Sequence, residues 1–249
     1  MNIGIIIQAR LGSTRLPGKI LKPFHGDKCI LDIILDKLHQ ASDAKVIVAT
    51  STSQDNDALV EHLEQNKELF FRGSENDVLD RFIKAAEKHH VDGIIRICSD
   101  NPFIDPDGIK ALIEKAQHSE AQYIGFKING LPSIKTHFGF WGEFVTLEAL
   151  KKVAASTDDV PAHEHVTIHI YTHPEEYRCE WMDCPDFIQG RNDIRLTVDT
   201  QEDFSNTRQV YSDLEKTHPN FGLQEIVNYI DQHDELKSSM KRIIKQNTK

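Results

Sequence analysis

The chain has 249 residues, of which 39% are hydrophobic and 27% are charged, and its formal net charge at pH 7 is −10. This length can bury one full α/β core, and we expect a single domain over residues 1–249. The acidic balance argues against a protein that binds nucleic acid or a membrane surface, because such proteins gather cations.

Three further features bear on where the protein works. No segment approaches the roughly 20 apolar residues of a membrane span. The N-terminus lacks the basic start and apolar core of a signal peptide, and the four cysteines form no CxxC pair. We therefore expect a cytoplasmic protein with reduced thiols.

Short apolar runs alternate with segments of helical period through the first half of the chain. The expected strands are Ile3–Ala9, Val46–Ala49, Leu69–Arg72 and Ile94–Cys98. The expected helices are Ile30–His39, Asp57–Gln65, Asp77–His89 (with Ser74 as a candidate cap) and Asp107–Ala116. This β–α repetition predicts an α/β fold with a mostly parallel twisted sheet and helices on both faces.

The pattern changes after about residue 121. Further strand candidates are Gln122–Ile128, Phe138–Glu143 and Ile194–Val198. Helical period returns in Thr146–Ala154, Ala162–Tyr171, Glu202–Lys216, Gly222–Ile230 and Glu235–Ile244. We expect residues from about 121 to 190 to form a small α+β lobe, for substrate or subunit contact, within the one domain.

The most informative segment is QARLGSTRLPGK, residues 8–19, directly after the first expected strand. Glycine lets backbone amides approach an anion closely, and Arg10, Arg15 and Lys19 add positive charge suited to phosphate oxygens. The segment is not a P-loop, because five residues separate Gly12 from Gly18 where the Walker pattern has four. It predicts a polyphosphate-binding loop; the alternative is an ordinary connection with exposed charges.

Two aspartates follow expected strands in distant parts of the chain. Asp100 lies two residues after the expected strand Ile94–Cys98, and Asp199 directly follows the expected strand Ile194–Val198. Carboxylates at the carboxyl ends of strands can meet at one sheet edge, and carboxylates beside phosphates suit Mg²⁺. The alternative is structural, with Asp100 forming a turn and Asp199 or Thr200 capping the next helix.

The glycine-bearing segment resembles the cytidylyltransferase family that makes CMP-activated acidic sugars. It is most similar to the spore-coat polysaccharide and pseudaminic-acid-type branch. The resemblance implies a nucleotide-diphospho-sugar transferase-like fold and a loop that grips the triphosphate of CTP through Ala9, Arg10, Gly12, Ser13, Arg15 and Lys19. It also implies that Asp100 and Asp199 hold the magnesium ion and, with Arg10, Arg15 and Lys19, form the catalytic set. The sequence departs from the family at Ser99, where glycine is frequent, and at Asn101, where cysteine or glutamate is common.

A second segment of the same branch is similar to RGSENDVLDR, residues 72–81. The resemblance implies that Arg72, Ser74, Asp77 and Arg81 lie on the cytidine or substrate side of the site. The alternative is that this is only a strand, a turn and a helix start, with its acids favoured by the helix dipole.

Three histidines, His163, His165 and His169, raise the question of a zinc site, because the last two lie four apart on one face of an expected helix. The pattern is not HExxH, and a packing or interface role is the alternative. The resemblance favours a substrate-lobe or subunit-contact role.

These observations predict a magnesium-dependent enzyme that transfers CMP from CTP to an acidic sugar-like acceptor, releases pyrophosphate, and serves surface polysaccharide or glycan synthesis. A homodimer is expected, as for many soluble enzymes. The alternatives are a glycosyltransferase of similar fold that uses a sugar nucleotide, and a non-catalytic nucleotide-binding subunit.

Overall fold

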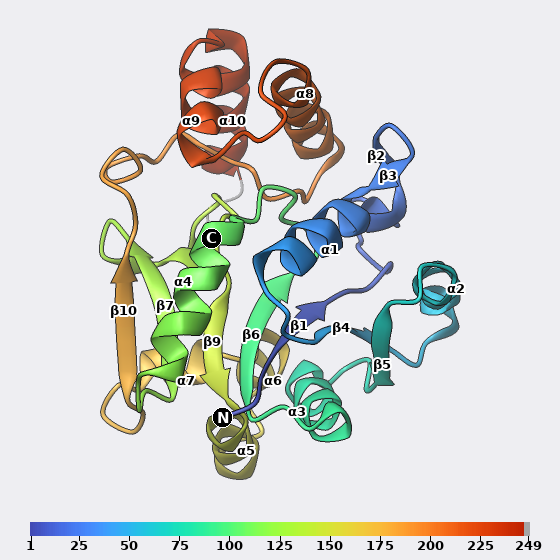
Figure 1. The fold of residues 1–249 in the computed structure, drawn as a ribbon, viewed down its shortest axis with the longest axis vertical. Coiled ribbons are helices and arrows are strands. Elements are labelled where there is room, and N and C mark those ends of the chain that lie inside the picture. Colours follow the sequence, from blue (N-terminus) through green and yellow to red (C-terminus); the bar gives the residue numbers. More distant parts are fainter. Residues whose placement is uncertain (247–249) are drawn as a thin grey trace.

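A computed structural model describes residues 1–246 and contains an eight-stranded mixed sheet flanked by helices (Figure 1). Seven strands follow the order β10-β7-β9-β6-β1-β4-β5, and β8 pairs with β7. The strands are β1 (Ile3–Gln8), β4 (Val46–Ser51), β5 (Leu69–Gly73), β6 (Gly93–Cys98), β7 (Tyr123–Ile128), β8 (Leu131–Pro132), β9 (Glu143–Thr146) and β10 (Cys179–Asp183). Pairing is parallel from β6 through β1 and β4 to β5, and antiparallel where β9 joins β6 and β7.

The two faces of the sheet build two separate hydrophobic clusters. Successive side chains of a strand point to opposite faces, so Ile5 and Ile7 enter one cluster while Ile6 enters the other. The first cluster is covered by α1 (Ile30–Ala41), α2 (Asp57–Gln65) and α4 (Pro106–Gln117). The second is covered by α3 (Val78–His89), α5 (Leu147–Ser156), α6 (Val160–His165) and α7 (Ile168–Thr172). The predicted arrangement, with helices on both faces of a mostly parallel sheet, is confirmed.

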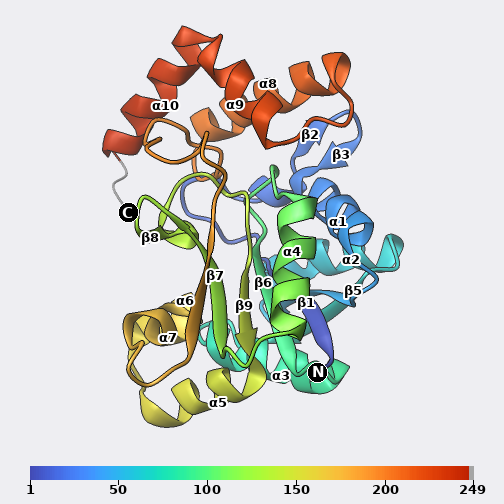
Figure 2. The same cartoon turned by 60° about the vertical axis from the view of Figure 1, so that its left-hand side comes forward.

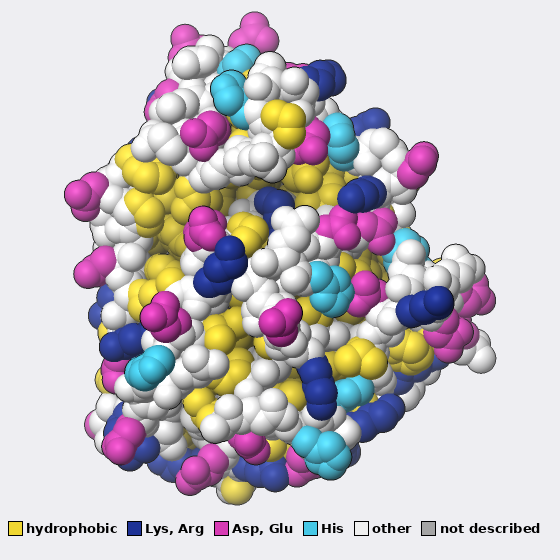
Figure 3. Space-filling view, viewed as in Figure 1, with side chains coloured by type: hydrophobic (Ala, Val, Ile, Leu, Met, Phe, Trp, Pro, Cys, Tyr) yellow, Lys and Arg dark blue, Asp and Glu magenta, His cyan; other side chains and the backbone are white. Residues whose placement is uncertain are grey.

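A helical layer lies beyond one end of the sheet (Figures 1 and 2). It consists of α8 (Gln201–Thr217), α9 (Leu223–Asp231) and α10 (Asp234–Gln246). The hairpin of β2 (Pro23–His25) and β3 (Lys28–Cys29) packs against this layer, since the ring of Phe24 meets that of Phe204 edge-on at 5.4 Å. No helix of the described residues is long and apolar enough to cross a membrane. Acidic and basic side chains are interspersed over the face drawn in Figure 3.

Two predicted strands are wrong. Phe138–Glu143 is a loop up to Glu143, where β9 begins, because Gly139 has a left-handed φ of +67° and the carbonyl of Phe140 accepts a hydrogen bond from Asp105 instead of a neighbouring strand. Ile194–Val198 is buried but is not a strand. Its amides bond to two loops, with Leu196 and Thr197 donating to His137.

Other boundaries also need correction. The predicted helix Ala162–Tyr171 is two short helices, α6 and α7, because Val166 adopts a φ of +56° between them. Asp77, not Ser74, caps α3: its side chain accepts a hydrogen bond from the amide of Asp80. The hairpin β2–β3 and strand β10 were not predicted.

Candidate active site

The candidate site lies where the carboxyl ends of β1 and β6 meet. From β1 the parallel order runs to β4 and β5 on one side, whereas β6 lies on the other side. The connections therefore leave neighbouring strands in opposite directions, which opens a crevice at the sheet edge where α/β proteins bind ligands. The loop after β1 (residues 9–18) and the loop after β6 (residues 99–105) both end here.

The loop after β1 is compact and open in front. The carbonyl of Leu11 accepts hydrogen bonds from the amides of Ser13, at 2.8 Å, and Gly18, at 3.0 Å. Gly18 needs its left-handed φ of +66° to begin the short 3₁₀-helix η1 (Lys19–Leu21). A Cβ added at Gly12 or at Gly18 would meet nothing within 4 Å, but the φ of Gly12, unlike that of Gly18, is not left-handed. The space before Gly12 is therefore free for a ligand to approach the backbone.

Four of the five predicted catalytic residues come together at this crevice. The Nζ atom of Lys19 lies 3.1 Å from Oδ2 of Asp100 and 3.4 Å from Oδ1 of Asp199, and it also donates to the carbonyl of Val198. The guanidinium of Arg15 lies 2.9 Å from the same Oδ1 of Asp199. Lys19 is almost fully buried, with 11% of its side chain exposed, whereas the side chain of Arg15 is 52% exposed.

The structural alternative holds in part, because Asp100 lies in a turn and the cap that it assigns to Asp199 or Thr200 is made by Thr200. Thr200 caps α8, in a capping box with Asp203, and Asp105 caps α4. Neither Asp100 nor Asp199 is needed as a cap, and both carboxylates face the ammonium of Lys19. Two carboxylate oxygens directed at one cation form a hard-oxygen donor set, which fits a divalent ion of the Mg²⁺ type.

Arg195 holds Asp199 in place through a hydrogen bond. The sequence analysis assigned no role to this arginine. Its fully buried guanidinium donates to Oδ2 of Asp199 at 3.0 Å and makes two bonds to Asp203, at 2.7 and 2.9 Å. The spacing of Arg195, Asp199 and Asp203 at i, i+4 and i+8 was the available signal.

A second cationic pair lies on the other side of the loop. Arg81 is fully buried, and Nη1 donates to the carbonyl of Ser74, but Nε and Nη2 have no partner among the described residues. Burial, and then the charge of Arg10, lower the pKa of Arg81. Two neighbouring guanidinium groups, of which Arg81 has donors without a partner among the described residues, favour an anion between them.

The remaining residues of RGSENDVLDR make contacts within the fold. Arg72 donates to the carbonyls of Ser51 and Ser53 and pairs with Asp57 at 2.8 Å. Its contacts hold the loop after β4 against the end of β5. Ser74 accepts a hydrogen bond from the amide of Asp77 at 3.1 Å.

Asp77 also joins α3 to α6. Its Oδ2 lies 2.8 Å from Nδ1 of His163, whose Nε2 lies 2.9 Å from the carbonyl of Thr157. Both ring nitrogens thus face acceptors, which only the protonated imidazolium can satisfy. The Thr157 carbonyl and, after it, Asp77 raise the pKa of His163. His165 and His169 do not share a helical face, because Val166 breaks the helix between them.

A small cavity next to Asp100 contains two polar atoms to which the sequence analysis assigned no role in binding. Oδ1 of Asn101 and Oγ1 of Thr197 are buried and have no hydrogen-bond partner among the described residues. Phe138, Phe140 and Trp141 line the same cavity. Buried polar atoms are costly unless they are paired, so these two fit a ligand with hydroxyl or amide groups.

A family model described as cytidylyltransferase matches residues 4–245. The spore coat polysaccharide biosynthesis protein SpsF of Bacillus subtilis is 36% identical over 220 residues, which is 84% of this chain and 86% of SpsF. The 8-amino-3,8-dideoxy-manno-octulosonate cytidylyltransferase of Shewanella piezotolerans is 27% identical over 190 residues, covering 69% of this chain and 75% of that enzyme.

Solved structures agree with the fold. The structure of a cytidylyltransferase from Leptospira borgpetersenii aligns with a TM-score of 0.80 at 28% identity, over 95% of this chain and 96% of that one.

Proposed function

The chain belongs to the cytidylyltransferase family, and from this premise we propose that it transfers CMP from CTP to an oxygen of an acidic sugar, with a magnesium ion and with release of pyrophosphate. It is a nucleotidyltransferase, so the glycosyltransferase alternative is set aside. The single observation that supports the proposal most is the convergence of Lys19, Asp100 and Asp199 at the end of β1 and β6.

In this proposal, the triphosphate lies against the loop of residues 9–18. Arg10 and Arg81 supply donors on one side, and Arg15 and Lys19 supply them on the other. The open space before Gly12 completes the cradle. Arg72, Ser74 and Asp77 act indirectly, because their contacts hold together the ends of β4 and β5 and the start of α3.

Asp100 and Asp199 would hold the metal ion. A divalent ion supplies charge neutralisation on the phosphate oxygens when it is bound. The protein then needs little covalent chemistry of its own. An acceptor oxygen attacks the α-phosphorus, the bond to the β-phosphate oxygen breaks, and Lys19 and Arg15 offset the charge that gathers on the leaving pyrophosphate.

The acceptor would occupy the cavity beside Asp100. Oδ1 of Asn101 can accept a hydrogen bond from a sugar hydroxyl, and the hydroxyl of Thr197 can donate or accept one. The aromatic wall of Phe138 and Phe140 would cover an apolar face of the ring. The octulosonate named for the Shewanella relative is a sugar acid, and SpsF is named for spore coat polysaccharide; both support an acidic sugar and a role in polysaccharide synthesis.

Residues 121–190 are proposed as the lobe for substrate and subunit contact. Val160 and Leu131 lie in this range and are 70% and 53% exposed, which suits an apolar contact between two copies. We propose that the protein is a homodimer and that it works in the cytoplasm. Light scattering on a sizing column measures the oligomeric state.

The test is a pyrophosphate-release screen of the four ribonucleoside triphosphates against a panel of acidic sugars, with and without Mg²⁺. The proposal expects release with CTP, Mg²⁺ and at least one sugar acid such as an octulosonate. Binding of CTP without pyrophosphate release from any acceptor would favour a non-catalytic nucleotide-binding subunit. Release with a different nucleotide would contradict the assignment of CTP.

A further inference from the structure

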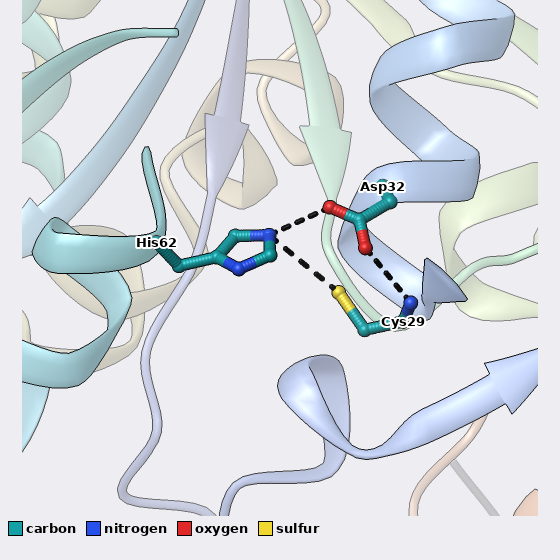
Figure 4. A group of neighbouring side chains, drawn as sticks. All are labelled: Cys29, Asp32 and His62. Atoms are coloured by element: carbon teal, nitrogen blue, oxygen red, sulfur yellow. Dashed lines mark hydrogen bonds and ion pairs between the residues drawn. The ribbon is translucent and has the colours of Figure 1, made fainter. Parts of the chain in front are cut away.

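Three side chains of different chemistry meet between α1 and α2 (Figure 4). Cys29 ends β3, Asp32 lies in the first turn of α1, and His62 lies in the last turn of α2. One donor atom from each of the three lies within 4.8 Å of the other two. In the part of the chain that the structure describes, no other group of three or more His, Cys, Asp or Glu residues has this property.

Each contact in this group directs a possible metal ligand to the same point. Nε2 of His62 lies 2.6 Å from Oδ1 of Asp32 and 3.9 Å from Sγ of Cys29. The other oxygen of Asp32, Oδ2, accepts a hydrogen bond from the backbone amide of Cys29 at 2.8 Å. That bond fixes the carboxylate at the start of α1 and leaves Oδ1 for the ligand set, as hydrogen bonds to ligating carboxylates do in metal sites.

We propose that Cys29, Asp32 and His62 bind one zinc ion. Sulfur, imidazole nitrogen and carboxylate oxygen together are the donor types of zinc, whereas Mg²⁺ takes oxygen ligands. The set is therefore distinct in kind from the oxygen donors of Asp100 and Asp199.

The distances are compatible with a tetrahedral ion after a small movement. Zinc bonds of about 2.0–2.3 Å place neighbouring ligand atoms about 3.3–3.7 Å apart. The 3.9 Å between Sγ and Nε2 is close to this spacing, and the 2.6 Å between Nε2 and Oδ1 has to widen. The side chains of Asp32 and His62 are 21% and 27% exposed, so they can turn and a water can enter as the fourth ligand.

A zinc ion that binds Nε2 of His62 has to displace the side-chain amide of Asn66 from that nitrogen. Its Nδ2 lies 3.3 Å from Nε2 of His62 and also donates to the backbone carbonyl of His62 at 2.9 Å. The hydrogen bond to the backbone carbonyl of His62 keeps the Asn66 amide in place when an ion binds the ring nitrogen.

The thiol must lose its proton when zinc binds. Burial and then the hydrogen bond with Asp32 raise the pKa of Cys29 to about 12, so without a metal ion the group is a neutral thiol and not a nucleophile. Zinc replaces that proton, as it does at other cysteine sites. The bound ion would join the β3–α1 junction to α2 and stabilise the folded chain.

The experiment is a titration of the full chain with Co²⁺, followed by displacement with Zn²⁺. We expect about one equivalent of Co²⁺ to give a thiolate-to-cobalt charge-transfer band and the intense visible bands of tetrahedral cobalt, and Zn²⁺ to remove both. We also expect Zn²⁺ to raise the melting temperature by roughly 5–10 °C at about 100 times its dissociation constant.

The variants separate this site from other cysteines and from the oxygen site. Cys29→Ser and His62→Gln should lose the charge-transfer band and the thermal shift. Cys184→Ser should keep both, because Cys184 is equally buried, at 4% exposure, and is not part of the group. His62→Gln covers the case in which Cys29→Ser does not fold, since the side chain of His62 is 27% exposed and Cys29 is buried. A wild-type protein without a thiolate band, or a band that survives either substitution, overturns the proposal.

Discussion

The backbone amide of Val198 donates a hydrogen bond to the carbonyl oxygen of Asp100 over 2.9 Å. This one bond joins the loop after β6 to the segment that precedes α8, two parts of the chain that are far apart in sequence. It places Asp199 beside Asp100 and puts both within reach of Lys19. The candidate site therefore depends on a junction between two loops and not on a single motif.

Asp199→Asn should remove most of the turnover. The amide lacks the charge that a metal ion needs, and the loss of one electrostatic contact of this kind costs on the order of 10²–10³-fold in rate. The bonds between Arg195 and Asp203 and the cap at Thr200 remain, so the fold should persist. Steady-state kcat with Mg²⁺ measures the effect, and Asp107→Asn, an exposed change on α4, is the control. Wild-type rates in Asp199→Asn would remove this residue from the metal site.

Substitution of Arg15 and substitution of Lys19 should lower the free energy of unfolding by different amounts. Arg15→Ala removes a half-exposed ion pair and should cost less than about 1 kcal/mol, while raising the KM for CTP about tenfold. Lys19→Met removes the nearly buried ammonium between Asp100 and Asp199 and leaves Asp100 without its cation, which should cost about 3–5 kcal/mol. Mg²⁺ should restore part of that loss, because the ion can occupy the position of the ammonium. Chemical denaturation with and without Mg²⁺ measures both variants, and equal losses of stability would contradict the central position of Lys19.

Thr197→Val should separate acceptor binding from CTP binding. Valine keeps the shape of the side chain and removes a hydroxyl that has no partner in the described residues, so stability should not fall. The KM for the acceptor should rise about tenfold while the KM for CTP stays the same. Asn101→Ala should act in the same direction. A rise in the KM for CTP alone would place the acceptor elsewhere.

The contact between α3 and α6 should weaken as the pH rises. The folded state raises the pKa of His163 above the ordinary 6.5, through the Thr157 carbonyl and then Asp77. The stability that this gives is fully present below pH 6.5 and is lost as the pH rises through the raised pKa. For a partly exposed pair the effect is a few tenths to about 1 kcal/mol. Melting temperatures of wild type and His163→Gln from pH 5 to 9 should converge at high pH; a constant difference would exclude the titration.

The first half of the fold could be predicted because its signals are local. The runs that became β1, β4, β5 and β6 are apolar and short, and the helices between them carry a clear helical period. In α3, for example, Val78, Leu79, Phe82 and Ala86 all turned out to be buried, as their spacing predicts.

The second half could not be predicted as well, because its backbone bonds are non-local. Ile194–Val198 reads as a strand from composition, but its partners are the carbonyls of His137 and Asp100, which no local pattern reveals. Val166 holds a strained positive φ that its side chain disfavours, so no sequence signal marks the break between α6 and α7. In the same way, Asp100 and Asp199 could be singled out by type and position, whereas Asn101 was noted only as a departure from the family, and the binding role of Asn101 and Thr197 is suggested by their burial without partners among the described residues.

The most direct test of the account is a crystal structure of the protein with CTP and Mn²⁺, in which anomalous scattering locates the ion. The account predicts an anomalous peak between the carboxylates of Asp100 and Asp199, with the triphosphate against residues 9–18 and Lys19 on a phosphate oxygen. A peak at any other place, or a triphosphate that lies away from Arg15 and Lys19, would contradict it.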